Sequence, residues 1–239
     1  MINVIENERI NSELRKLYKD NTEKFLKLWK ECYNENPPIR MNEFGIIDPE
    51  KYDAQNGILV IGRETNGVEG WFENNSDDDL FINWMRKISI GTCGLPKRPN
   101  IWYNTARYIM TARGEKEKSL SCEKKDLLPV LGTMAFTNIN KVGGGSSSGK
   151  SYWKLYEKDI VIQLIVKEIE IIKPKYIILC DRYFEKFLTV QNATHFAGND
   201  SALEDCINNG RLLIAYHPAA RMSKEKMLDK LEKQIKGEN

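Results

Sequence analysis

The sequence predicts an α/β protein with a doubly wound, mainly parallel sheet of four strands flanked by helices. Two observations lead to this prediction. Short apolar runs recur along the chain, and segments with helical periodicity separate them. In sheets of this kind ligands bind beyond the carboxyl ends of the strands. Residues that directly follow the strands are therefore the first candidates for function.

Four apolar runs are the predicted strands. The first ends in Gly62 and is continuously apolar, as expected of a strand that is buried on both faces. Pro174 stands just before the third run and excludes a continuing helix there. The runs are residues 58–61, 134–137, 176–180 and 212–216.

Amphipathic helices are predicted around these strands. Residues 5–33 carry apolar side chains three and four apart, and prolines 37 and 38 are expected to end that segment. Residues from about 152 to 172 predict one long helix, and residues 223–236 a charged terminal helix. We expect a single domain over residues 1–239, with 1–56 as an N-terminal helical extension and 57–236 as the core.

Composition excludes several classes of protein. The net charge of +2 gives no overall polybasic character, so any DNA binding must come from local patches. The five cysteines are odd in number, lie far apart and form no CxxC pair, which argues against a zinc site, an iron-sulfur cluster or a disulfide framework. No run is long enough to span a membrane, and the N-terminus lacks a secretory apolar region. We expect a cytoplasmic monomer with no metal and no cofactor.

Polar residues follow every predicted strand. Alone, each is more often a helix cap or a turn former than a functional group. Together they would converge on one edge of the sheet, which favours a site there. They are Arg63, Glu64, Thr65 and Asn66 after the first strand, Asn138, Asn140 and Lys141 after the second, Asp181 and Arg182 after the third, and His217 and Arg221 after the last.

Three of these segments resemble the signatures of the uracil-DNA glycosylase superfamily. They are G-R-E-T-N-G at 62–67, F-T-N-I-N-K at 136–141 and Y-H-P-A-A-R at 216–221, and their order also matches. The resemblance covers about residues 57–236 and implies a uracil-DNA glycosylase-like fold. It also implies a DNA glycosylase, a hydrolase that flips a base out of DNA and cleaves its N-glycosidic bond to leave an abasic site.

The resemblance implies two catalytic residues. Glu64 would orient water and offset the positive charge that develops on the sugar, and His217 would stabilise the departing base as an anion. This chain departs from the pattern at two positions, since Arg63 occupies the alternative slot for the acid and Thr65 replaces the usual proline. Strict uracil specificity therefore does not follow. A damaged base, or a modified base of phage DNA, fits the same signatures, so the role is base excision in repair or in antiviral defence.

Base recognition is assigned by the same resemblance. Asn138 would hydrogen-bond the edge of the flipped base, because its amide offers both donors and an acceptor. Thr65 and Asn66 would lie beside it. Trp71 and Phe72, soon after the first signature, are candidates for stacking on the base, with core packing as the alternative.

The expected partner is double- or single-stranded DNA, gripped through its phosphates. A run of charged residues is more often a solvated face, so positions close to the signatures carry most weight. Lys97, Arg98 and Lys224 are weaker candidates. The predicted DNA-binding residues are Lys141, Gly144, Gly145, Ser146, Ser147, Lys150 and Arg221.

A nucleotide-binding protein is the main alternative. Residues 144–151 match the P-loop pattern GxxxxGK[ST], and residues 177–181 imitate the strand and acid of a Walker B motif. However, polar residues separate this loop from its strand, the match consists largely of Gly and Ser, and it leaves two signatures unexplained. A catalytically inactive DNA-binding relative is a third interpretation.

Overall fold

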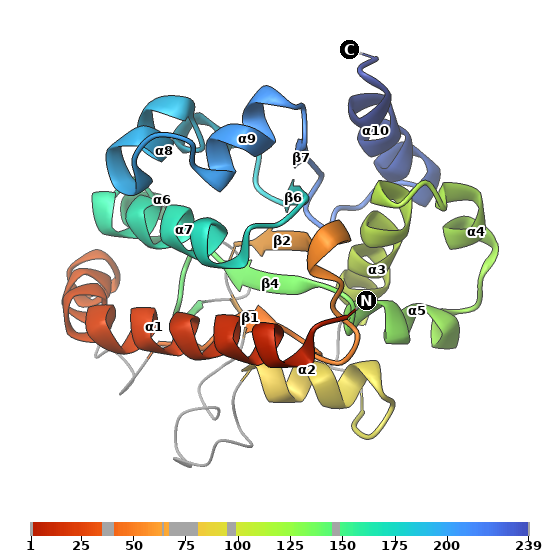
Figure 1. The fold of residues 1–239 in the computed structure, drawn as a ribbon, viewed down its shortest axis with the longest axis horizontal. Coiled ribbons are helices and arrows are strands. Elements are labelled where there is room, and N and C mark those ends of the chain that lie inside the picture. The colour runs from red at the N-terminus through yellow and green to blue at the C-terminus, as the bar shows by residue number, and fades with distance from the viewer. Residues whose placement is uncertain are drawn as a thin grey trace.

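The computed structural model of the chain describes residues 2–34, 41–63, 65–66, 81–94, 99–144 and 149–238. Its centre is a five-stranded sheet with the order β1-β4-β2-β6-β7 (Figure 1). Four strands run parallel, whereas β1 is antiparallel to β4. The strands are β1 (Gly45–Ile46), β2 (Ile58–Gly62), β4 (Ala135–Asn138), β6 (Tyr176–Leu179) and β7 (Leu212–Ile214).

The predicted α/β class with a mainly parallel sheet is confirmed, but the sheet has one more strand than expected. The additional strand, Gly45–Ile46, comes from the N-terminal segment that was assigned to helix alone. It contains only two residues, which is too short for the alternation by which strands are identified in a sequence.

The order of the strands defines where a site can form. The chain passes from β2 to β4 on one side, and then crosses back to β6 on the other side of β2. Gly62, at the end of β2, pairs with Asn138 at the end of β4, and Ile61 pairs with Leu179 of β6. The carboxyl end of β2 is therefore the point where the topology reverses, which is where open α/β sheets bind their ligands.

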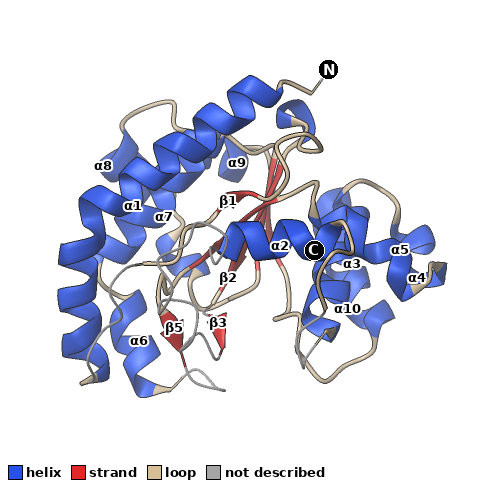
Figure 2. Ribbon diagram, turned by 90° about the horizontal axis from the view of Figure 1, so that it is seen from below, coloured by secondary structure: helices blue, strands red, loops and turns tan. Residues whose placement is uncertain are grey.

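Helices cover both faces of the sheet (Figure 2). One side carries α1 and α6–α9, and the other carries α3–α5 and α10. The buried apolar side chains form one cluster that runs from α1 to α10. The helices are α1 (Val4–Tyr33), α2 (Phe81–Ser89), α3 (Asn100–Ala112), α4 (Lys116–Ser121), α5 (Lys124–Leu131), α6 (Lys150–Tyr156), α7 (Asp159–Ile172), α8 (Val190–Ala197), α9 (Ala202–Asn208) and α10 (Lys224–Lys236).

One helix agrees with the sequence-based expectation and one differs from it. The helix α1 covers the expected segment 5–33, and it ends where Asn34 adopts the left-handed conformation that terminates helices. The helix expected over about 152–172 is two helices, α6 and α7, because Lys158 is extended between them. No proline or glycine marks this break, but Asp159 begins the second helix with a negative charge that suits its N-terminus.

Both edges of the sheet are bonded to side-chain amides from helices. Asn11 of α1 accepts a hydrogen bond from the backbone N–H of Ile46 (2.9 Å) and donates one to its carbonyl (3.0 Å). At the opposite edge, Gln234 of α10 makes the same pair of contacts with Ile214, at 2.8 and 3.0 Å. Each amide satisfies backbone groups that face away from the rest of the sheet.

Candidate functional site

A second, two-stranded sheet joins the loops that follow β2 and β4. In it, β3 (Thr65–Asn66) pairs in parallel with β5 (Gly143–Gly144). The backbones of two segments predicted to bind base and DNA phosphate therefore lie side by side, at the carboxyl edge of the main sheet (Figure 2).

Asn138 is held tightly at the end of β4. A Cβ atom at Gly62 would come within 2.3 Å of the Asn138 Oδ1 atom and 3.1 Å of the Phe136 ring. Only glycine allows the amide to approach β2 so closely. The glycine that opens the first signature is thus explained by packing against the second.

Arg63 and Asp181, which follow the adjacent strands β2 and β6, form an ion pair. The Arg63 Nε and Asp181 Oδ2 atoms lie 3.0 Å apart. The Nε–H group is not aimed at that oxygen, so the contact is electrostatic rather than a linear hydrogen bond. Asp181 is fully buried, and it also accepts hydrogen bonds from the Tyr152 hydroxyl and the Tyr183 backbone N–H, both at 2.9 Å.

Two aromatic rings lie between two cations in a row that leads from this pair out to the surface. The Arg63 guanidinium lies 5.8 Å from the centre of the Trp153 ring, and Trp153 meets Tyr183 edge to face at 5.4 Å. The Tyr183 ring is half exposed and carries the Arg182 guanidinium at 5.2 Å. These four side chains, Arg63, Trp153, Tyr183 and Arg182, are called the stacked row below.

His217 follows β7 and is held as a neutral imidazole. Burial lowers its pKa to about 4; the Arg63 cation contributes to this shift, and Asp181 opposes it. The backbone N–H of Ala219 donates to the Nδ1 atom at 3.2 Å. Because Nδ1 is the acceptor, the single proton of the neutral ring resides on Nε2.

The helix α3 positions the loop that carries His217. Asn104 donates to the Pro218 carbonyl at 2.7 Å, and the Tyr108 hydroxyl donates to the Tyr216 carbonyl at 2.9 Å. Neither residue follows a predicted strand, so neither is a candidate on the basis of sequence. Their spacing of four within a helix puts both on the face that meets the loop, but no local pattern names a partner more than a hundred residues away.

The prediction that Lys141 contacts DNA is wrong. Its side chain is completely buried, and its Nζ atom lies 2.6 Å from the Glu168 Oε1 atom. The ammonium also donates to the Thr137 hydroxyl at 2.6 Å. Asn140 is likewise internal, accepting from the Val142 backbone N–H and donating to the Tyr33 hydroxyl. Both residues build the turn after β4 rather than a surface.

The remaining predicted residues fall into three groups. Lys150 opens α6 and is exposed, as are Arg221 and Lys224 on the last loop. Thr65, Asn66 and Gly144 are described through their strands alone. Several predicted positions lie outside the described residues, namely Glu64, Trp71, Phe72, Lys97, Arg98, Gly145, Ser146 and Ser147.

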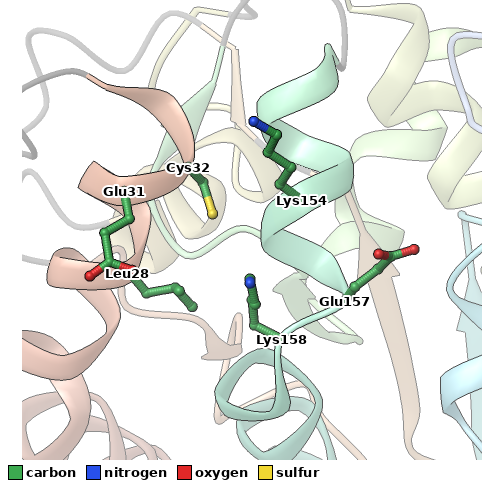
Figure 3. Close-up of a pocket in the computed structure, with 6 residues that line it drawn as sticks. All are labelled: Leu28, Glu31, Cys32, Lys154, Glu157 and Lys158. Atoms are coloured by element: carbon green, nitrogen blue, oxygen red, sulfur yellow. The ribbon is translucent and has the colours of Figure 1, made fainter.

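A cavity of about 350 Å³ lies away from these strand ends, between α1 and α6 (Figure 3). The Lys154 and Lys158 amines and the Cys32 sulfur face it. The carboxylates of Glu31 and Glu157 lie at its outer sides. None of the strand-end residues line it, so its position gives no support to the chemistry proposed from them.

In the part of the chain that the structure describes, no three His, Cys, Asp or Glu side chains gather as metal ligands would. No helix in those ranges combines the length and apolar character that crossing a membrane requires.

The fold and the strand-end cluster define an α/β protein whose candidate site lies where the sheet topology reverses. In comparisons with known proteins, no family model, no curated protein and no solved structure matched the chain.

Proposed function

We propose that this chain is a DNA glycosylase of the uracil-DNA glycosylase type, which flips a base out of DNA and hydrolyses its N-glycosidic bond. One observation carries the proposal. His217 follows the edge strand β7, and the charges of Arg63 after β2 and Asp181 after β6 act on its ring. It is a neutral imidazole whose proton is on Nε2. A neutral donor fixed in this way suits an oxygen on which negative charge develops.

The proposed reaction divides its charges between two sides. Cleavage of the bond makes the sugar cationic and the departing base anionic. The Nε2–H group of His217 would donate a hydrogen bond to the base oxygen. Asn138, at the end of β4, would hydrogen-bond the edge of the base. Glu64 is the proposed carboxylate on the sugar side. Its assignment rests on the sequence resemblance, and it follows directly after Arg63 in the chain.

Contacts with DNA are proposed for exposed groups near the strand ends. Tyr183 and Arg182, the outer half of the stacked row, offer an aromatic face and a cation. Aromatic rings and cations together bind bases and phosphates without regard to sequence. Lys150 and Arg221 are exposed cations that would neutralise phosphate charge.

The nucleotide-binding alternative has less support. The strand β4 ends at Asn138 and α6 begins only at Lys150, with the Gly143–Gly144 pairing between them. A P-loop instead leads from its strand straight into the helix. Moreover, the acid in the Walker B position, Asp181, is buried and bonded to Tyr152 and Tyr183, so it does not face a metal-nucleotide complex.

One experiment decides between enzyme and inactive relative. Single-turnover reactions with duplex and single-stranded oligonucleotides would present uracil, oxidised or alkylated bases, and modified bases from phage DNA. We expect free base and an alkali-sensitive abasic site from at least one substrate. DNA binding without release of any base would instead support the inactive DNA-binding relative.

A matched pair of histidine variants ties this activity to the site. His217→Gln removes the Nε2–H donor, and excision should fall by roughly two to three orders of magnitude, a typical loss for one electrostatic stabiliser. His195→Gln, which changes the other histidine of the chain on α8, should excise at the parent rate. Equal rates for both variants would remove His217 from the mechanism.

Glu64→Gln tests the acid in the same assay. It keeps the size of the side chain and removes its charge, so excision should also fall by roughly two to three orders of magnitude while DNA affinity is kept. An unchanged rate would transfer the search for the acid to other carboxylates.

Lys150→Ala separates DNA binding from nucleotide binding. Loss of one phosphate contact should weaken DNA binding and reduce the slope of affinity against salt by about one ion. Lys19→Ala on the exposed side of α1 is the control. Micromolar binding of ATP or GTP that Lys150→Ala abolishes would reverse the ranking of the two functions.

A further inference from the structure

We propose that Arg63 supplies a fixed positive charge at the base pocket and stabilises the anion that develops on the departing base next to His217. The inference rests on the proposed glycosylase function. It gives a chemical role to a residue that occupies the alternative slot for the acid in the first signature.

Arg63 is immobilised before any ligand arrives. Its guanidinium is flanked by the Asp181 carboxylate at 3.0 Å and the Trp153 ring at 5.8 Å. Asp181 is itself fixed by Tyr152 and by the backbone N–H of Tyr183. A cation that is already in place needs no reorganisation when charge develops beside it, which makes its stabilisation effective.

The guanidinium also keeps donors for another partner. A quarter of the Arg63 side chain is exposed, whereas the Asp181 side chain is fully buried. A guanidinium carries five N–H groups, and Asp181 lies beside the Nε atom. The position after β2 puts this partly open cation at the point where the sheet topology reverses.

The pKa of His217 reports the sign of the electrostatic potential at its imidazole ring. Of the charged groups that act on it, Arg63 after β2 disfavours the imidazolium, and Asp181 after β6 favours it to a smaller extent. From the other packed elements, Lys230 of α10 lies on the Tyr216 ring at 4.6 Å, and the uncharged Tyr108 of α3 bonds the Tyr216 carbonyl. Arg221 of the same loop is exposed. A field that disfavours positive charge on the ring favours negative charge on a group bonded to it.

The role of Arg63 fits a balanced reaction. The bond between the sugar C1′ atom and the base nitrogen breaks, and its electron pair leaves on the base. Water adds its hydroxide to C1′, and the proton released from water neutralises the base. Arg63 exchanges no proton, because an arginine side chain stays protonated in proteins. Its contribution is confined to the interval in which the base carries the electron pair.

The first test does not depend on activity. The chain has two histidines, so the ring signals of His217 can be followed by NMR during a pH titration, with His195→Gln to assign them. Arg63→Gln should raise the pKa of His217 toward the ordinary value of about 6.5. Arg63→Lys should keep most of the depression, and Arg182→Gln, at the exposed end of the stacked row, should leave the pKa unchanged. An unaltered pKa in Arg63→Gln would overturn the proposal.

The second test uses the leaving group. Oligonucleotides with 5-fluorouracil, uracil or thymine present bases that depart with decreasing ease. Arg63→Gln should slow single-turnover excision by about 10- to 100-fold, and the loss should grow from 5-fluorouracil to thymine. Comparing variant with parent on the same base cancels differences in how each base fits. An equal loss on all bases would contradict stabilisation of the departing anion.

The two tests separate the inference from the proposed function. A parent protein that excises no base, but in which His217 responds to Arg63→Gln, contradicts the glycosylase assignment and supports the charge assignment. A parent protein that excises bases with no dependence on Arg63 supports the function and overturns the inference.

Discussion

Two ion pairs lie at the ends of the neighbouring strands β2 and β4, and their surroundings differ. Lys141 and Glu168 have no exposed side-chain surface, and the Thr137 hydroxyl lies between them. Arg63 and Asp181 form a pair of which one partner is buried and the other is one-quarter exposed. A strand end thus predicts where polar residues gather, whereas packing determines which of them can meet a ligand.

The difference follows from what covers each pair. The aromatic rings of Tyr18 and Phe44 lie against the Lys141 ammonium, at 5.8 and 5.4 Å, and close the site from the side of α1 and β1. Burial lowers the pKa of Lys141, and Glu168 opposes that shift. On the other side of β2, Trp153 stands beside Arg63 and leaves part of the cation open. The N-terminal segment, which lies outside the family resemblance, therefore seals one of the two pairs.

The largest expected effect concerns the sealed pair. Lys141→Met leaves the Glu168 carboxylate buried without a counter-charge, so the free energy of unfolding should fall by about 3–5 kcal/mol. Urea denaturation would measure the change. The double variant Lys141→Met/Glu168→Leu, which removes both charges, should recover most of the loss. A single variant as stable as the parent would mean that the pair is not sealed.

A pH response is expected on the open side of the sheet. The pKa of His217 is about 4 in the folded chain and about 6.5 when unfolded, so the unfolded state binds more protons between these values. Stability should therefore be lost as pH falls from about 6.5 toward 4, by on the order of 2–3 kcal/mol from this group. Urea denaturation at several pH values would show it as a difference from His217→Gln. Identical pH profiles for parent and variant would contradict the assigned pKa.

Gly62 lies between the two ion pairs, where the end of β2 pairs with Asn138 at the end of β4. Gly62→Ala forces a Cβ atom to within 2.3 Å of the Asn138 amide, so β2 or Asn138 must shift. We expect a loss of about 1–3 kcal/mol in stability and a marked loss of excision, measured by urea denaturation and single-turnover assay. Gly94→Ala is the matched control, since a Cβ there meets no atom within 4 Å. A Gly62→Ala variant indistinguishable from the control would disprove the tight approach.

The smallest expected effect concerns the partly exposed pair of Arg63 and Asp181. Tyr152→Phe removes the hydroxyl that donates to Asp181 but keeps the ring, so stability should fall by roughly 1–2 kcal/mol. Tyr156→Phe, in the ring that stacks on Tyr152 at 5.7 Å, controls for the change of side chain. The pKa of His217 should change in Tyr152→Phe and not in Tyr156→Phe. Without the Tyr152 hydroxyl, the Asp181 carboxylate can move relative to Arg63, which changes the charge that acts on His217. The same NMR titration measures it.

Much of the framework could be predicted from the sequence. The strand β2 is a continuous apolar run ending in glycine, and its bounds differ little from the expected ones. The strand β1 could not be predicted, because two residues carry no period. It exists because β4 offers an edge and Asn11 satisfies its outer side.

The site was harder to predict because its partners are distant in the chain. Lys141 was assigned to DNA because it follows a strand, and nothing adjacent to it signals burial. One clue was available, since Glu168 lies three and four residues from Ile165 and Ile172, on the apolar face of its helix, where a carboxylate needs a buried cation. Asp181 was identified as a strand-end residue, but its pairing with Arg63 depends on the order of strands that only the folded sheet reveals.

The amides of Asn11 and Gln234 have a consequence for how copies of this chain can associate. A sheet with an unsatisfied outer strand can recruit a strand from another molecule, the route by which many folded proteins polymerise. Here the outward N–H and C=O groups of Ile46 and Ile214 are already taken by side chains of the same chain. A second copy would have to displace a helix-borne amide to extend the sheet at either residue. The two amide side chains therefore limit extension of the sheet by a second copy at both of its edges.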